Sequence, residues 1–279
     1  MEEIHELHGV ERTLLAALKV KKDEFYHPQP ILKDPLAKDI FESLRLDENE
    51  FKLNRHSATA ALFRARKIDQ WVTEFMEANP DGLVIDLGCG LDPRFSRLDN
   101  GQITWIDIDF PEVIRLRKKF FQENPRYRMI GKSILDFSWF DDALPMAKGK
   151  IIIVAEGVLP YLEKAQFLHL FQEISVKFPR AFLVFDLCSE LLTRKKFVRI
   201  LKKAGTVLHW GVNDTRELIN PERGLGLLEE WRYYDQFQQR YGISNFFHFI
   251  PALNNIFRIV KCQFLQNERI SMNGGHRND

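Results

Sequence analysis

The stretch from Leu83 to Arg94, "LVIDLGCGLDPR", runs from an apolar segment into a glycine-rich turn of the kind that lies beneath nucleotide-like ligands. Asp86 precedes Gly88 and Gly90, whose lack of side chains lets the backbone approach a ligand closely. A dinucleotide site has a third glycine where Pro93 stands here, which disfavours a pyrophosphate. The turn suits S-adenosylmethionine, which has a ribose and a charged amino-acid tail. An ordinary turn that closes a buried strand would also use two glycines.

A second acid ends the next apolar run, "ITWIDIDFPEVI". Asp109 follows Gly90 by about 20 residues, the spacing at which a carboxylate accepts hydrogen bonds from both ribose hydroxyls. Asp107 shares its strand face but lies deeper in the strand and is the weaker candidate. Asp109 also suits an N-cap ahead of Pro111, and the two roles are compatible. A nicotinamide cofactor would use the same acid, so Asp109 indicates a nucleoside without identifying it.

Composition excludes several classes of protein. The 279 residues carry 40 basic and 39 acidic side chains, a formal net charge of +1 that attracts neither nucleic acid nor an anionic membrane. Cys89, Cys188 and Cys262 are far apart and lack zinc-ligand spacing, so no metal site is expected. The N-terminus lacks the basic region of a secretory signal, and no run approaches 18 apolar residues. We expect a cytoplasmic protein with a small-molecule partner; the oligomeric state is not indicated.

The pattern of apolar residues predicts the elements that position these acids. Residues 1–80 space their apolar side chains three and four apart, which predicts helices. Beyond them, short apolar runs alternate with helix-like stretches, which predicts a mostly parallel sheet covered on both faces. We predict one domain with a helical cap (1–80), a cofactor-binding core (81–187), a lid and substrate region (188–230) and C-terminal strands (231–279).

Three longer motifs, "CGLDPR", "DIDFPEVI" and "AEGVLPYL", occur in order along the chain. With them the chain resembles the leucine carboxyl methyltransferase family, and within it the bacterial branch similar to tetracenomycin-type polyketide O-methyltransferases. The resemblance extends from about Glu11 to about Gln263. It implies a class I, S-adenosylmethionine-dependent methyltransferase: an α/β fold with a Rossmann-like seven-stranded sheet, an N-terminal helical cap and a lid inserted after the fifth strand.

The resemblance also implies how the cofactor lies in the site. Gly88 and Gly90 would pass beneath its methionine part, and Asp109 would hold its ribose. In "GKSILDF", Ser133 and Ile134 match an adenine-contacting pair. Carboxyl-methylating members tend to have an acid at the position of Ser133, whereas this chain has its acid at Asp136. Either Ser133 or Asp136 is then a candidate for the exocyclic amine.

Three further residues match positions at the methionine end of the cofactor. Glu156 follows the apolar run "IIIVA", where a carboxylate is costly to bury without a donor, and a ligand ammonium would serve; an ordinary helix cap is the alternative. Arg64 matches the arginine that grips the cofactor's carboxylate with a bidentate fork. Lys21 matches a basic residue near the same site, although "KVKKDE" is also an ordinary charged surface run.

Methyl transfer from a sulfonium is an in-line displacement, in which positioning supplies most of the catalysis. The sequence marks no catalytic residue. Tyr161 is a candidate for orienting the acceptor, although an aromatic after a strand is often packing. We predict O-methylation of a carboxyl or hydroxyl oxygen on a small, polyketide-like molecule. The alternatives are carboxyl methylation of a protein C-terminus and, more distantly, a nicotinamide-dependent oxidoreductase.

Overall fold

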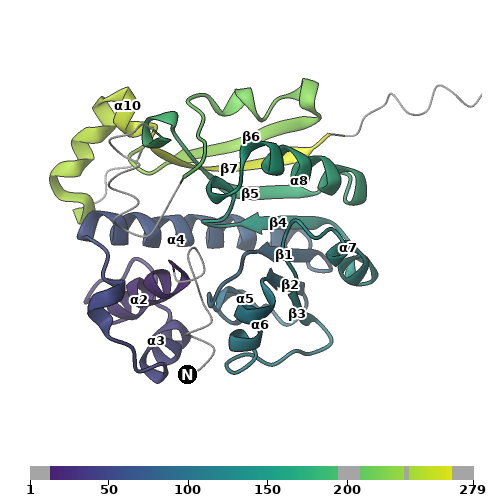
Figure 1. Cartoon of the computed structure of the whole chain (residues 1–279), viewed down its shortest axis with the longest axis horizontal. Coiled ribbons are helices and arrows are strands. Elements are labelled where there is room, and N and C mark those ends of the chain that lie inside the picture. Colours follow the sequence, from purple (N-terminus) through teal and green to yellow (C-terminus); the bar gives the residue numbers. More distant parts are fainter. Residues whose placement is uncertain (1–12, 194–207, 236–238, 266–279) are drawn as a thin grey trace, which may run out of the picture.

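One mixed sheet organises the computed structural model, which describes residues 13–193, 208–235 and 239–265 (Figure 1). The strands lie in the order β3-β2-β1-β4-β5-β7-β6. Their bounds are β1 (Leu83–Leu87), β2 (Thr104–Asp109), β3 (Tyr127–Gly131), β4 (Ile151–Ala155), β5 (Phe182–Cys188), β6 (Leu225–Arg232) and β7 (Phe257–Phe264). The first five pair in parallel, and β7 pairs antiparallel with both β5 and β6. The predicted α/β class and seven-stranded sheet are confirmed.

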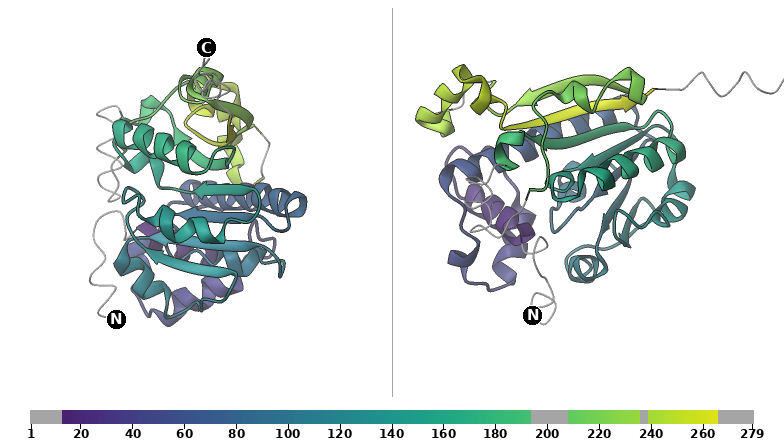
Figure 2. Two further views of the ribbon diagram at one scale, coloured as in Figure 1. Left: turned by 90° about the vertical axis from the view of Figure 1, so that its right-hand side faces the viewer. Right: turned by 45° about the horizontal axis from the view of Figure 1, so that its top comes forward.

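Helices account for most of the chain before β1, as predicted. The helices are α2 (Thr13–Phe25), α3 (Pro35–Ser43), α4 (Arg55–Ala78), α5 (Arg94–Leu98), α6 (Pro111–Arg117), α7 (Trp139–Ala143), α8 (Lys164–Lys177) and α10 (Pro251–Asn254). The short 3-10 helices are η2 (Glu48–Phe51), η3 (Leu144–Met146), η4 (Leu159–Tyr161), η5 (Glu190–Thr193), η6 (Thr215–Glu217), η7 (Pro221–Arg223) and η8 (Gln239–Phe249). Figures 1 and 2 show α2 and α3 grouped together at one end of the molecule.

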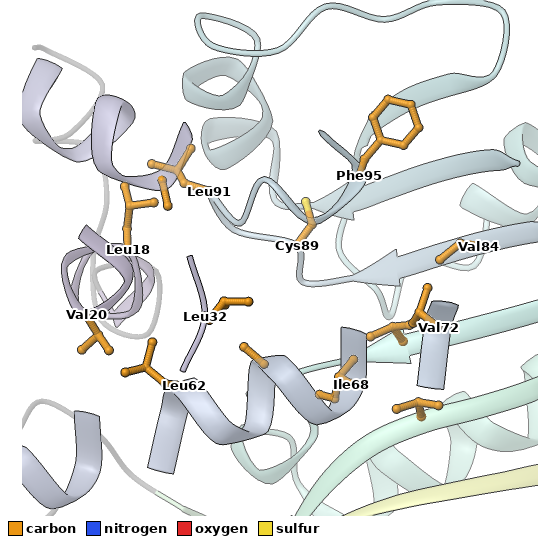
Figure 3. Close-up of a cluster of buried hydrophobic side chains, with 14 of the residues drawn as sticks. Leu18, Val20, Leu32, Leu62, Ile68, Val72, Val84, Cys89, Leu91 and Phe95 are labelled. Atoms are coloured by element: carbon orange, nitrogen blue, oxygen red, sulfur yellow. The ribbon is translucent and has the colours of Figure 1, made fainter. Parts of the chain in front are cut away.

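The sheet is buried on both faces, which explains the continuous apolar runs of its parallel strands. Every residue of β1 is buried. Val84 points into a core that also holds Ile68 and Val72 of α4 (Figure 3), whereas its neighbour Ile85 points into a second core on the other face. Alternate side chains therefore anchor the two helical layers to one strand.

The strand order reverses direction between β1 and β4. The chain moves outward through β2 and β3, then returns to β4 on the other side of β1. Ligands of such sheets bind at the carboxyl ends of the strands beside this switch point. The turns after β1 and β4 meet there, because a Cβ on Gly88 would lie 2.3 Å from Cγ2 of Val158. With a φ of +68° as well, the position requires glycine.

The predicted lid region, 188–230, differs from the structure at one boundary. β6 begins at Leu225, so the range includes the start of a C-terminal strand. Most of the basic amphipathic segment expected to form the lid, 194–207, lies outside the described residues. Within the described ranges, no helix is long and apolar enough to cross a membrane.

Replacing Gly88 by alanine should be more costly than the same change at Gly101. Both glycines have positive φ, but an added Cβ on Gly101 meets nothing within 4 Å. Gly101→Ala should therefore cost about 1–2 kcal/mol for the left-handed backbone alone. Gly88→Ala should add roughly 1–3 kcal/mol for the clash with Val158. Urea unfolding of both variants measures the difference, and equal losses of stability would contradict the close approach of the two turns.

Candidate active site

A cavity of about 1090 Å³ opens at the carboxyl ends of the parallel strands. It is lined by the turns after β1 and β4, the end of β2, the loop after β3, and side chains of α2, η2 and α4. Small-molecule sites usually enclose roughly 300–1,000 Å³, so this cavity has room for a nucleoside cofactor together with an acceptor.

All but one of the site residues predicted from the sequence line this cavity. They are Lys21, Arg64, Asp86, Gly88, Gly90, Asp109, Ser133, Ile134, Glu156 and Tyr161. The exception is Asp136, whose exposed carboxylate accepts a hydrogen bond from the backbone N–H of Ser138 at 3.1 Å. The chain turns between Ser133 and Asp136, where the Asp136 N–H donates to the Ser133 carbonyl at 2.9 Å. Asp136 therefore lies off the cavity that Ser133 lines, and a contact of either residue with adenine stays a prediction.

Asp109 holds the glycine turn in place. Its Oδ2 accepts the backbone N–H of Gly90 at 2.7 Å, and its Oδ1 accepts that of Phe110 at 2.8 Å. The partly buried carboxylate also lines the cavity. The same carboxylate therefore orders the turn and faces the space where the resemblance places the ribose.

Asp107, by contrast, is committed to the protein interior. It is 1% exposed and accepts hydrogen bonds from Trp105 Nε1 at 2.8 Å, Arg117 Nη2 at 2.5 Å and the Tyr127 hydroxyl at 2.5 Å. Nη1 of Arg117 donates to the Gly90 carbonyl at 2.9 Å. Asp107 thus supports the glycine turn from behind and is absent from the cavity lining, in keeping with its lower rank in the sequence analysis.

The methionine end of the predicted site contains a carboxylate that sequence reasoning missed. Arg64 Nε donates to Glu156 Oε1 at 2.9 Å, and Arg64 Nη1 donates to Asp186 Oδ2 at 3.2 Å. Asp186, within β5, also accepts the Gly157 N–H at 2.6 Å. Arg64 and Glu156 were each expected to bind the cofactor; the structure pairs them with each other. Asp186 stands in an apolar run, "LVFDLC", where burial raises its pKa against the opposing charge of Arg64.

Arg94 is the second residue that the sequence analysis did not single out. This guanidinium is 1% exposed and donates to Asp69 Oδ1 at 2.8 Å, to Asp86 Oδ2 at 3.0 Å and to Glu156 Oε2. It also lies 3.3 Å from Asp92 Oδ2. Four carboxylates from α4, β1, the glycine-rich turn and the turn after β4 therefore surround one cation. The motif "CGLDPR" contains both Asp92 and Arg94, and is the sequence feature that could have pointed to Arg94.

The charges of this cluster set the pKa of its acids. Burial raises the pKa of Asp86 to about 7, although the positive charge of Arg94 works to lower it. Burial also works to raise the pKa of Glu156, but Arg64 and Arg94 together outweigh it, so that the pKa is lowered. Glu156 therefore stays ionised beside the cavity at neutral pH.

Asp92 connects the helical cap to the turn. Its Oδ2 lies 2.6 Å from Lys21 Nζ of α2, and its Oδ1 lies 3.0 Å from Arg97 Nη1. Burial opposes ionisation, but the charges of Arg97 and Lys21 hold the pKa of Asp92 well below its usual range. Arg97 Nη1 also donates to Asp34 Oδ2 at 2.6 Å. These ion pairs hold α2 and the segment before α3 against the mouth of the switch point.

Tyr161 lies in η4, lines the cavity, and packs against the small cluster of Cys188, Leu192 and Leu208. This position is compatible with both roles that the sequence suggested for Tyr161, a contact with the acceptor and packing. Among the described residues, no histidine lines the cavity. His209 instead pairs with Glu163 at 2.8 Å.

Comparison with known proteins identifies the family. The profile of the leucine carboxyl methyltransferase family matches residues 12–175. A curated relative, the tetracenomycin polyketide synthesis O-methyltransferase TcmP of Streptomyces glaucescens, is 33% identical over 84% of this chain and 87% of its own. The chain belongs to the leucine carboxyl methyltransferase family. Membership makes it an S-adenosylmethionine-dependent methyltransferase, as the sequence predicted, and excludes the nicotinamide alternative.

A second relative and two solved structures agree with this assignment. The S-adenosyl-L-methionine-dependent methyltransferase dpfgK of Gibberella zeae is 29% identical over 78% of this chain and 80% of its own. A duf574 family protein from Streptomyces avermitilis has a TM-score of 0.57 at 12% identity, covering 90% of this chain and 97% of that one. A putative methyltransferase from Thermobifida fusca has a TM-score of 0.57 at 14% identity, covering 93% and 95%. At these identities the two structures support the fold alone.

Removing the buried cation should destabilise the protein more than removing an exposed one. Arg94→Met leaves four carboxylates without their shared partner, which typically costs about 3–5 kcal/mol. Arg126→Ala is the matched control, because Arg126 pairs with Asp99 at 2.7 Å on the surface and should cost about 0–1 kcal/mol. Urea unfolding without cofactor measures both. If Arg94→Met lowered the free energy of unfolding by less than about 1 kcal/mol, the charge of Arg94 would not be what holds the four carboxylates together.

Asp109→Ala should weaken binding of S-adenosylhomocysteine by roughly 1.5–3 kcal/mol, the usual range for a hydrogen bond to a charged group. Asp136→Ala removes a carboxylate that lies off the cavity and should leave the affinity unchanged. Isothermal titration of the two variants separates the predictions. If Asp136→Ala bound S-adenosylhomocysteine more weakly and Asp109→Ala bound it normally, the adenosine would lie near Asp136, contrary to this prediction.

Proposed function

We propose that the protein transfers a methyl group from S-adenosylmethionine to a carboxylate oxygen of a small, partly apolar molecule. Its methyl ester is the product. The observation that carries this choice of oxygen is the chemistry of the cavity lining, which offers cations for a carboxylate and, among the described residues, no histidine to activate a hydroxyl.

A carboxylate needs no general base, because it is already ionised at neutral pH. A phenol or alcohol would need one within hydrogen-bond reach. Of the five carboxylates that line the cavity, Asp86, Asp92 and Glu156 are each engaged by arginine or lysine side chains, and Asp109 accepts two backbone N–H groups. Lys21 and Arg64 supply positive charge along the same wall. The lining thus favours attraction of an anion over removal of a proton.

The cap supports a small acceptor rather than a protein tail. Leu14 of α2 lies 3.2 Å from the point that a Cβ on Gly90 would occupy, so α2 is packed directly over the glycine turn. Apolar side chains of α2 and η2 continue the wall. The name of TcmP, a tetracenomycin polyketide synthesis O-methyltransferase, favours a polyketide-like acceptor.

Within this site, catalysis rests on position. Holding an acceptor oxygen and a methyl carbon about 3–3.5 Å apart and collinear can supply on the order of 7–11 kcal/mol. The buried ion pairs fix the turns on both sides of the switch point, and with them the floor on which the cofactor would lie. Tyr161 is proposed to orient the acceptor. A cytoplasmic location belongs to the same proposal, and the three free, buried cysteines support it.

The proposal can be tested by comparing three candidate acceptors in the same methyl-transfer assay. We expect methyl transfer from labelled S-adenosylmethionine to a polycyclic aromatic carboxylate, and little transfer to the matching phenol or to a peptide with a free C-terminal leucine. The label should be released by mild alkali, as a methyl ester requires. Above about pH 8, where Asp86 with its pKa of about 7 is ionised, kcat/KM for the carboxylate should be flat, because the acceptor itself ionises near pH 4.

Two outcomes would contradict it. Preferential labelling of the phenol, with a rate that rises with pH, would indicate a general base and a hydroxyl acceptor. Preferential labelling of the peptide would indicate a protein carboxyl methyltransferase.

A further inference from the structure

A second, smaller cavity of about 220 Å³ lies against another face of α2. It is bounded by α2, η2 and the loop that follows, the first turns of α4, and Arg240 of η8. Part of its lining is charged: Arg240 Nη2 donates to Glu24 Oε2 at 2.6 Å, and Lys19 Nζ donates to Asp23 Oδ2 at 2.5 Å. None of the predicted cofactor-binding residues lines it.

One layer of residues separates this cavity from the active site. Val20, Phe51, Leu53 and Leu62 line both cavities. Val20, Phe51 and Leu62 are 6%, 7% and 3% exposed and belong to the hydrophobic core. Figure 3 shows Val20 of α2 and Leu62 of α4 on the two sides of the gap between these helices. The partition is therefore apolar and made of side chains from three separate elements.

The partition bounds the end of the active site that is remote from the adenosine end. Leu62 lies two positions before Arg64 on α4, which packs against β4 and β5. Asp109, the last residue of β2, and Ser133, after β3, mark the predicted adenosine end on the other side of the switch point. An acceptor placed beyond the methionine end of the cofactor would therefore meet this wall.

We propose that the second cavity is an extension of the acceptor site that the partition separates from it, and that Phe51 limits the length of the acceptor. The ligand class is an elongated, partly apolar carboxylate. Phe51 is the bulkiest of the four partition residues, so its ring is the largest single obstacle. A cavity of roughly 150 Å³ can hold a benzene ring, so a volume of about 220 Å³ has room for about one further ring among the charged side chains of the extension. The inference rests on the proposed function.

The test compares two acceptors, a one-ring and a three-ring aromatic carboxylate, in wild type and Phe51→Ala. The variant should raise the ratio of kcat/KM for the long acceptor over the short one at least tenfold. Its affinity for S-adenosylhomocysteine should stay within twofold of wild type, because the wall lies away from the adenosine end. Ala58 lines only the second cavity, so adding Ala58→Phe to Phe51→Ala should refill the extension and return the ratio to the wild-type value.

The inference is overturned if Phe51→Ala changes both acceptors by the same factor, or if Ala58→Phe does not reverse the gain. If Phe51→Ala fails to fold, Phe51→Leu should shift the ratio in the same direction by a smaller factor, and no shift in this folded variant is equally decisive. If wild type methylates no carboxylate, the proposed function fails. In that case the preference for the long over the short carboxylate is measured as a ratio of binding affinities. Both carboxylates are titrated by fluorescence into wild type and Phe51→Ala, each saturated with S-adenosylhomocysteine.

Discussion

The buried guanidinium of Arg94 is the interaction on which the rest of the site depends. It joins Asp69 of α4, Asp86 of β1, Asp92 of the glycine-rich turn and Glu156 after β4. These residues come from the cap, from β1 and from the turns that follow β1 and β4. A fork of five N–H donors suits this arrangement, because one planar group can bond several carboxylates at once. Without it, the acids would repel one another inside a buried site.

The same network explains why the cavity is organised before any ligand enters. Arg64 is held between Glu156 and Asp186, and Lys21 is held by Asp92. Lys21 and Arg64 thus each have their side chain held by an acid beside the cavity. A cofactor whose tail carries both an ammonium and a carboxylate can exchange partners with such pairs. Preorganised charge of this kind suits a reaction that depends on alignment more than on proton transfer.

Adjacent residues of helix α2 take part in two different contacts of the active site. α2 presents Lys21 to the glycine turn and Val20 to the partition between the two cavities. One helix thus contributes both to the wall beside the glycine turn and to the partition between the two cavities. The hydrophobic contacts with α4 and the ion pairs with the turn hold this helix in a single position.

The sequence by itself determined the α/β order of elements, the glycine turn and ten of the residues that line the cavity. These signals are local: apolar period, glycine spacing, and an acid at the end of a strand depend on neighbours along the chain. Only the tertiary structure decided that Asp136 turns away, that Arg64 and Glu156 pair with each other, and that Asp186, Arg94 and Phe51 belong to the site. Arg64 and Asp186 are 122 positions apart. Contacts between such distant residues depend on how strands and helices pack, and no local pattern encodes that geometry.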